Sequence, residues 1–148
     1  MGAKDGEETM ELKTKRLNEN ATLPTRGTEG AAGLDLYCNE TIYMKSGVVY
    51  RIPTGLALEI PPGHYGLLTG RSSTALKNIL VFPTVCDADY RGEIFITARF
   101  DGDGSWRISK GDRIAQIVIT PFAKATQVEA DELSETDRGT GGYGSTGD

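Results

Sequence analysis

The sequence contains few of the side chains on which many enzymes depend. It has one histidine, His64, and two cysteines, Cys38 and Cys86, in 148 residues. A single histidine excludes a His-rich metal site and leaves no convincing base for a Ser or Cys nucleophile. Two cysteines imply neither a disulfide framework nor a zinc cage. What remains is carboxylate chemistry, so we expect any reaction to use Asp or Glu with water and a hard metal ion.

Long apolar runs and surplus positive charge are also missing. No stretch approaches the length that spans a membrane, and the polar first nine residues do not resemble a signal peptide. The net charge is −5, with no basic stripe to displace counterions from a polyanion. We therefore expect no membrane partner, no direct nucleic-acid partner, and a location in the cytoplasm or nucleus.

Glycine, in contrast, is abundant. The 19 glycines and a hydrophobic content of 38% suit a sheet protein with many turns, or one that completes its core by oligomerising. Short apolar runs separated by turn residues predict a single all-β barrel or sandwich. These runs cover residues 48–52, 56–60, 65–69, 93–100, 106–108 and 114–119. A Pro-Thr-Gly turn at 53–55 is expected to separate the first two, and the only helical stretch is expected at 73–78. We divide the chain into a disordered extension (1–10), a barrel domain (11–128) and a flexible arm (129–148).

The glycine-rich segment at 138–147 is the most informative part of the arm. Arg138, Tyr143, Ser145 and Thr146 alternate with glycines that include Gly144, and this composition is typical of loops that grip phosphate. A P-loop or Rossmann glycine loop must lead into a helix, and none follows here. We therefore expect an arm that folds over a ligand bound elsewhere; the alternative is a frayed, solvated tail.

Two other segments offer polar groups that could bind or activate a ligand. Residues 87–94 place Asp87, Asp89 and Tyr90 at the bend between two apolar runs, and the two carboxylates would share a face if the segment were extended. An ordinary turn is the simpler explanation. Arg71 and the hydroxyls after it could bind an anion, although Ser72 or Ser73 could equally serve as a helix N-cap.

Asp35 and Gln116 are weaker candidates. Asp35 stands in an apolar run, where a carboxylate is costly unless it is hydrogen-bonded or lies near a metal. Residues 111–116 form a turn into a strand, with a potentially buried ion pair and the amide of Gln116. Structure alone could account for both.

Taken in order, five segments resemble the five motifs of the homotrimeric dUTPases over about residues 12–147. They are Ala-Ala-Gly-Leu-Asp-Leu, Gly-Arg-Ser-Ser, Asp-Ala-Asp-Tyr-Arg-Gly-Glu-Ile, Gly-Asp-Arg-Ile-Ala-Gln and the glycine-rich segment. The resemblance implies a jelly-roll-type β-barrel that forms a homotrimer, with active sites shared between subunits and closed by a neighbour's C-terminal arm. It also implies Mg²⁺-dependent hydrolysis of dUTP to dUMP and pyrophosphate, which clears dUTP from the DNA-precursor pool and supplies dUMP for thymidylate synthesis.

The resemblance also assigns roles to individual residues. Asp87 matches the carboxylate that deprotonates the attacking water, Tyr90 the residue packed under the deoxyribose, and Asp35 the group that holds Mg²⁺ through water. Segment 81–86 should form a hairpin that recognises uracil through main-chain groups. The other residues implied to bind dUTP are Arg71, Ser72, Ser73, Val81, Thr84, Val85, Cys86, Gln116, Arg138, Tyr143, Gly144, Ser145 and Thr146.

The chain departs from the family pattern at three places. Ser73 replaces a usual Gly, Tyr143 replaces the common Phe, and residues 82–86 replace the usual lead-in to the catalytic Asp. The Arg-Ser-Ser motif at 71–73 also resembles that of dCTP deaminase. Leu76, however, occupies the position of that enzyme's second Arg, and Thr97 occupies the position of its general base. A nucleotide-gated regulatory protein is a further alternative, although such a protein would not need Asp87.

Overall fold

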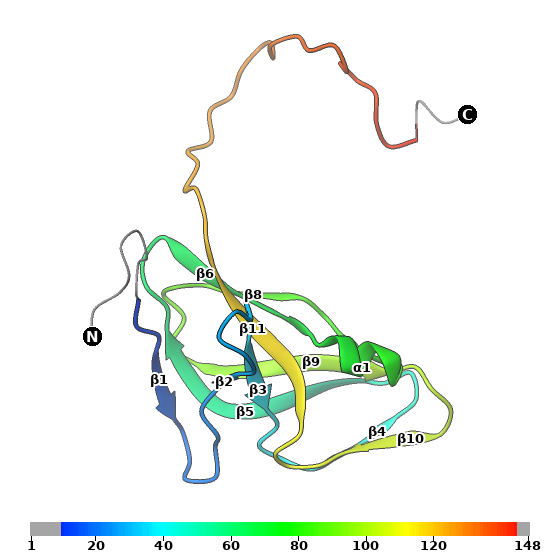
Figure 1. Cartoon of the computed structure of the whole chain (residues 1–148). Coiled ribbons are helices and arrows are strands. Elements are labelled where there is room, and N and C mark those ends of the chain that lie inside the picture. The colour runs from blue at the N-terminus through cyan, green and yellow to red at the C-terminus, as the bar shows by residue number, and fades with distance from the viewer. Residues whose placement is uncertain (1–9, 145–148) are drawn as a thin grey trace.

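The computed structural model describes residues 10–144, which contain eleven strands and one short helix (Figure 1). The strands follow the chain as β1 (Lys13–Arg16), β2 (Thr25–Arg26), β3 (Leu34–Tyr37), β4 (Ile42–Lys45), β5 (Val49–Glu59), β6 (His64–Gly70), β7 (Ile79–Val81), β8 (Thr84–Cys86), β9 (Glu93–Phe100), β10 (Ser105–Ile108) and β11 (Arg113–Pro121). The helix α1 (Ser72–Leu76) lies between β6 and β7.

The strands form three antiparallel sheets. One has the order β1-β5-β9-β7, the second β2-β3-β11-β6-β8, and the third pairs β10 with β4. Strand β9 shows the predicted alternation, since Ile94, Ile96, Ala98 and Phe100 are buried and the residues between them are half-buried. Their side chains join a single apolar cluster with residues of β3, β5, β6 and β11. The prediction of an all-β fold is confirmed.

The expected break between two strands at residues 53–55 is wrong. Strand β5 continues through this segment, with an irregular register against β9 between Pro53 and Ala57. The Thr54 hydroxyl donates to the Ile94 carbonyl at 2.6 Å, and the Gly55 N–H donates to the Glu93 carboxylate at 3.1 Å. Gly55 has a φ of 70°, so the segment forms an irregularity within one strand, where side chains satisfy backbone groups that leave the ladder.

Helix α1 begins earlier than predicted, and neither serine caps it. Arg71 is the N-cap residue. The Thr74 hydroxyl accepts the N–H of Arg71 at 3.1 Å and donates to the Arg71 carbonyl at 2.6 Å. Asn78, with a φ of 60°, lies two residues beyond the helix. Ser72 and Ser73 are therefore not used as caps.

Residues 122–144 contain no strand or helix and lead away from the sheets (Figure 1). Hydrogen bonds of Ala125, Arg138 and Gly139 go to other residues of this segment. No helix within residues 10–144 has the length and apolar character needed to cross a membrane. The division into an N-terminal extension, a domain and an arm stays a prediction, and residues 1–9 lie outside the described part.

Candidate active site

The loop between β8 and β9 (residues 87–92), here called the β8–β9 loop, carries the predicted catalytic carboxylate. The Tyr90 N–H donates to the Asp87 carbonyl at 3.1 Å, so the loop forms a turn at Ala88 and Asp89. Asp87 and Asp89 consequently line different cavities. The segment is the ordinary turn, not the extended strand in which the two carboxylates would share a face. The turn hydrogen bond replaces the extended backbone that a shared face requires.

A cavity of about 280 Å³, the β8–β9 cavity, brings several predicted residues together. Asp87 and Tyr90 line it with Thr84, Val85 and Cys86 from β8. Residues of β9 and Arg51 of β5 complete its wall. A larger cavity of about 590 Å³ lies on the Asp89 side of the loop but contains none of the predicted site residues. We therefore place the candidate site at the smaller one.

Contacts that the sequence did not indicate hold the β8–β9 loop in place. The Tyr90 hydroxyl donates to the Glu93 carbonyl at 2.8 Å, and a Cβ on Gly92 would lie only 2.5 Å from that hydroxyl oxygen. The Arg91 guanidinium donates to the Ala88 carbonyl at 2.5 Å and forms an ion pair with Glu59 of β5 at 3.7 Å. Sequence reasoning missed Arg91 and Gly92, because no pattern within the loop reveals which distant strand it contacts.

Segment 81–86 does not form a hairpin of paired strands. Strand β7, which ends at Val81, pairs with β9, whereas β8 pairs with β6 in another sheet. The Phe82 N–H donates to the Thr97 carbonyl at 2.9 Å and extends the β7–β9 ladder, and Pro83 has no N–H to donate. The segment therefore crosses from one sheet to the other, and main-chain recognition of uracil stays a prediction.

Cys86 faces the interior. It is buried, and its burial together with the nearby Asp87 carboxylate raises the pKa of the thiol. The thiol therefore stays neutral at physiological pH.

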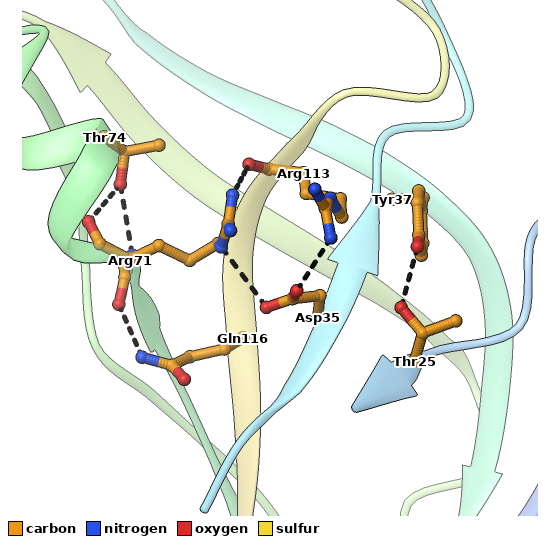
Figure 2. Close-up of polar contacts among 8 residues, drawn as sticks. Thr25, Asp35, Tyr37, Arg71, Thr74, Arg113 and Gln116 are labelled. Atoms are coloured by element: carbon orange, nitrogen blue, oxygen red, sulfur yellow. Dashed lines mark hydrogen bonds and ion pairs between the residues drawn. The ribbon is translucent and has the colours of Figure 1, made fainter. Parts of the chain in front are cut away.

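A second group, the cation cluster of Asp35, Arg71, Arg113 and Gln116, lies where β3, α1 and β11 meet (Figure 2). Nε of Arg71 lies 3.2 Å from one oxygen of Asp35, and Nη1 of Arg113 lies 3.3 Å from the other. Nη1 of Arg71 also donates to the Arg113 carbonyl at 2.8 Å. The partner that a buried Asp35 requires is therefore a pair of guanidinium groups. Segment 111–116 holds no ion pair of its own, because Arg113 pairs with Asp35 of β3 and Asp112 accepts the Ser109 N–H.

The amide of Gln116 is fixed beside this cluster. Its Nε2 donates to the Gly70 carbonyl at 3.0 Å (Figure 2). A Cβ on Gly33 would lie 2.2 Å from its Oε1. Ser72 is exposed and Ser73 half-buried at the start of α1. The absence of a side chain at Gly33, in the first motif, thus leaves space for the Gln116 amide of the fourth motif.

Residues 10–144 hold no cluster of three or more His, Cys, Asp or Glu side chains that could bind a metal ion unaided. Each oxygen of Asp35 already faces a guanidinium group, so the carboxylate does not fit direct ligation of Mg²⁺. A contact through water fits better, since Mg²⁺ usually keeps several of its waters.

Residues 138–144 of the glycine-rich segment lie away from the sheets and the helix (Figure 1). Nε of Arg138 donates to the Gly141 carbonyl at 2.6 Å, and Tyr143 is fully exposed. Tyr143 and Gly144 have φ angles of 47° and 79°. Ser145 and Thr146 lie outside the described residues.

The structure thus combines an antiparallel β fold, a cavity lined by an aromatic ring and a carboxylate, and a separate cation cluster. The family model described as dUTPase matches residues 19–147. The chain is 43% identical to the deoxyuridine 5'-triphosphate nucleotidohydrolase of Nautilia profundicola over 141 residues, which cover 93% of this chain and 99% of that protein. The corresponding protein of Hydrogenobaculum sp. is 44% identical over 142 residues, covering 93% of this chain and 99% of the relative. The chain belongs to the dUTPase family.

Solved structures agree with this assignment. The dUTPase of Staphylococcus bacteriophage 80alpha with dUPNHPP superposes with a TM-score of 0.89 at 32% identity, covering 94% of this chain and 99% of the phage protein. A dUTPase variant from phage phi11 of S. aureus, described with a structural Mg(II) ion, gives 0.81 at 26% identity over 84% of this chain and 99% of its own.

Proposed function

We propose that the β8–β9 cavity and the cation cluster together hydrolyse dUTP to dUMP and pyrophosphate, the reaction of the dUTPase family. The observation that carries this proposal is the cavity itself, in which Asp87 and Tyr90 lie beside residues 84–86. A carboxylate, an aromatic ring and three consecutive residues of β8 around one cavity of about 280 Å³ support this proposal.

Asp87 acts as the general base. Water attacks the α-phosphorus and loses a proton to the Asp87 carboxylate, the new P–O bond forms, and the bond from the α-phosphorus to the bridging oxygen breaks. Pyrophosphate leaves with that oxygen. A positioned base contributes about 10²- to 10⁴-fold to such a step. Tyr90 packs under the deoxyribose, where its ring, fixed through Glu93 and Gly92, excludes a 2′-hydroxyl.

The cation cluster binds the phosphates. Arg71 and Gln116 face the triphosphate, Ser72 and Ser73 donate hydroxyls, and Arg113 holds Asp35 in place. Asp35 would hold Mg²⁺ through the ion's water shell, and the ion would supply positive charge at the phosphate oxygens. Cations fixed in position by Asp35 let the cluster stabilise negative charge that develops during the reaction.

The active form is a homotrimer of jelly-roll-type barrels, in which each site is shared between subunits. Two features support this. The base-and-sugar cavity and the cation cluster are separate groups in one chain, and the arm leads away from both (Figure 1). Arg138, Ser145 and Thr146 of a neighbour's arm bind the γ-phosphate, and Tyr143 with Gly144 covers uracil. We place this trimer in the cytoplasm or nucleus.

A deaminase fits the cavity less well. Thr97 lines it where a deaminase needs its glutamate. The cavity's second carboxylate beside Asp87, Glu93, accepts the Gly55 N–H at 3.1 Å and so is engaged with the backbone.

The variant Asp87→Asn tests the mechanism. The amide keeps the shape of the side chain but cannot take the proton, so we expect turnover of dUTP to fall by about 10²- to 10⁴-fold with little change in binding. Pyrophosphate release gives the rate, and calorimetry with a non-hydrolysable analogue gives the affinity. Turnover close to that of the parent protein would remove Asp87 from the mechanism.

A further inference from the structure

A cavity of about 380 Å³ lies between α1 and the segment from β10 to β11, next to the cation cluster. We call it the basic cavity, because Arg71, Lys77, Arg107 and Arg113 line it. Two of these residues, Arg71 and Arg113, also belong to the cation cluster. The other two extend the positive charge beyond the groups assigned to the substrate.

The charge of the basic cavity is only partly compensated. Asp35 pairs with Arg71 and Arg113, and Asp112 is the carboxylate in the wall, where it accepts the Ser109 N–H at 2.8 Å. Within residues 10–144, neither Lys77 nor Arg107 forms an ion pair with a carboxylate. Four cations against two carboxylates leave an excess of positive charge in a chain whose net charge is −5. Such a local excess attracts a small anion.

The wall also shows which anion fits. Its aromatic ring, Trp106, is engaged by Lys77 at 5.9 Å and packs against Phe100 at 5.9 Å between ring centroids. The Thr74 hydroxyl is used inside α1. The cavity therefore offers cations without a free ring for a base to stack on, which favours an inorganic polyphosphate over a nucleotide.

We propose that the basic cavity binds inorganic pyrophosphate and guides this product away from the cation cluster. The proposal rests on the proposed function, in which the β- and γ-phosphates leave as pyrophosphate from Arg71. Arg71 and Arg113 face both spaces, so the product can exchange one set of cations for the next without passing through an uncharged region. Lys77 and Arg107 hold it transiently, and Mg²⁺ bound to the product lowers the charge that they must balance.

The test uses the full chain with Lys77→Gln, Arg107→Gln and the double variant, and Lys110→Gln as a matched control. Lys110 is an exposed cation near β10 that does not line the cavity. Calorimetric titration with magnesium pyrophosphate needs no turnover, so it can succeed or fail independently of the proposed function. We expect roughly 10-fold weaker binding in the double variant, as for loss of hydrogen bonds to a charged group, and no change in the control.

Kinetics complete the test. The inhibition constant of pyrophosphate in steady-state dUTP hydrolysis should rise by the same factor in the double variant, while its single-turnover rate stays within about twofold of the parent value. Unchanged pyrophosphate binding would overturn the proposal, as would binding too weak to detect in the parent protein. An equal loss of single-turnover rate would also overturn it, because the two cations would then serve the substrate.

Discussion

Replacing Gly33 by alanine should disturb the site through Gln116. The new Cβ would lie 2.2 Å from Oε1 of Gln116 and 3.0 Å from its Cδ, so the amide must move. Moving it breaks the hydrogen bond to the Gly70 carbonyl, which contributes about 0.5–1.5 kcal/mol to stability. Alanine also restricts the conformations of the unfolded chain more than glycine does, which stabilises the folded state by about 0.4–1 kcal/mol. We therefore expect the free energy of unfolding to change by no more than about 1 kcal/mol.

The effect on activity should be larger. If the Gln116 amide binds a phosphate, Gly33→Ala loses a hydrogen bond to a charged group, about 1.5–3 kcal/mol, and kcat/KM for dUTP should fall by about 10- to 100-fold. Urea unfolding and a pyrophosphate-release assay measure the two quantities. Gly30→Ala is the matched control, because a Cβ at Gly30 meets nothing within 4 Å.

A double-mutant cycle with Gln116→Ala tests whether Gly33→Ala lowers activity by displacing the Gln116 amide. Removing the amide removes the clash, so Gly33→Ala should cost little further activity in the Gln116→Ala background. Two outcomes would refute this reasoning: activity of Gly33→Ala equal to that of Gly30→Ala, or losses that simply add in the double variant.

Three further predictions concern the sugar, the arm and the core. Tyr90→Ala should narrow the preference for dUTP over UTP and weaken dUTP binding. If competition assays gave the variant the same dUTP-to-UTP ratio as the parent, a residue other than Tyr90 would exclude the 2′-hydroxyl. Removing residues 138–148 should abolish most dUTP hydrolysis without unfolding the sheets, because residues 138–144 contribute nothing to the apolar core, and a truncated chain of parental rate would contradict this. Burial and Asp112 raise the pKa of Cys38 from 9.0 to about 12, so the folded state holds this proton more tightly than the unfolded chain. The thiol's contribution to the free energy of unfolding is complete below pH 9 and falls above it by up to about 1.4 kcal/mol per pH unit. Between pH 8 and 10.5, urea unfolding should therefore show a larger loss of stability in the parent than in Cys38→Ala.

The sequence predicted the features that depend on neighbouring residues. The alternation in β9 identified a half-buried strand, and the spacing of Asp87 and Tyr90 placed both at one bend, where they line one cavity. Turn geometry inside that bend was not predictable from spacing alone. A single hydrogen bond, from the Tyr90 N–H to the Asp87 carbonyl, sends Asp89 to another cavity.

Features that depend on distant partners were missed. The ion pair between Asp35 and Arg113 joins residues 78 positions apart, and the contact of Arg91 with Glu59 depends on which strand lies beside the loop. The continuation of β5 through Pro53 was hidden for the same reason, since Glu93 and Ile94 of another strand accept its backbone and side-chain donors. Local composition indicates a turn there, and tertiary contacts override it.

The exposed segment after β11 sets how often the glycine-rich motif meets a site. About 16 residues separate β11 from Arg138, which gives a maximum reach of roughly 55 Å and an average coil span of about 22 Å. A motif tethered at this length behaves as a ligand at millimolar effective concentration, whatever the concentration of the protein. Doubling the tether would cost only about 0.6 kcal/mol in closure entropy. Natural selection can therefore vary the length of this segment widely, whereas the residues of the motif itself must match the site they close.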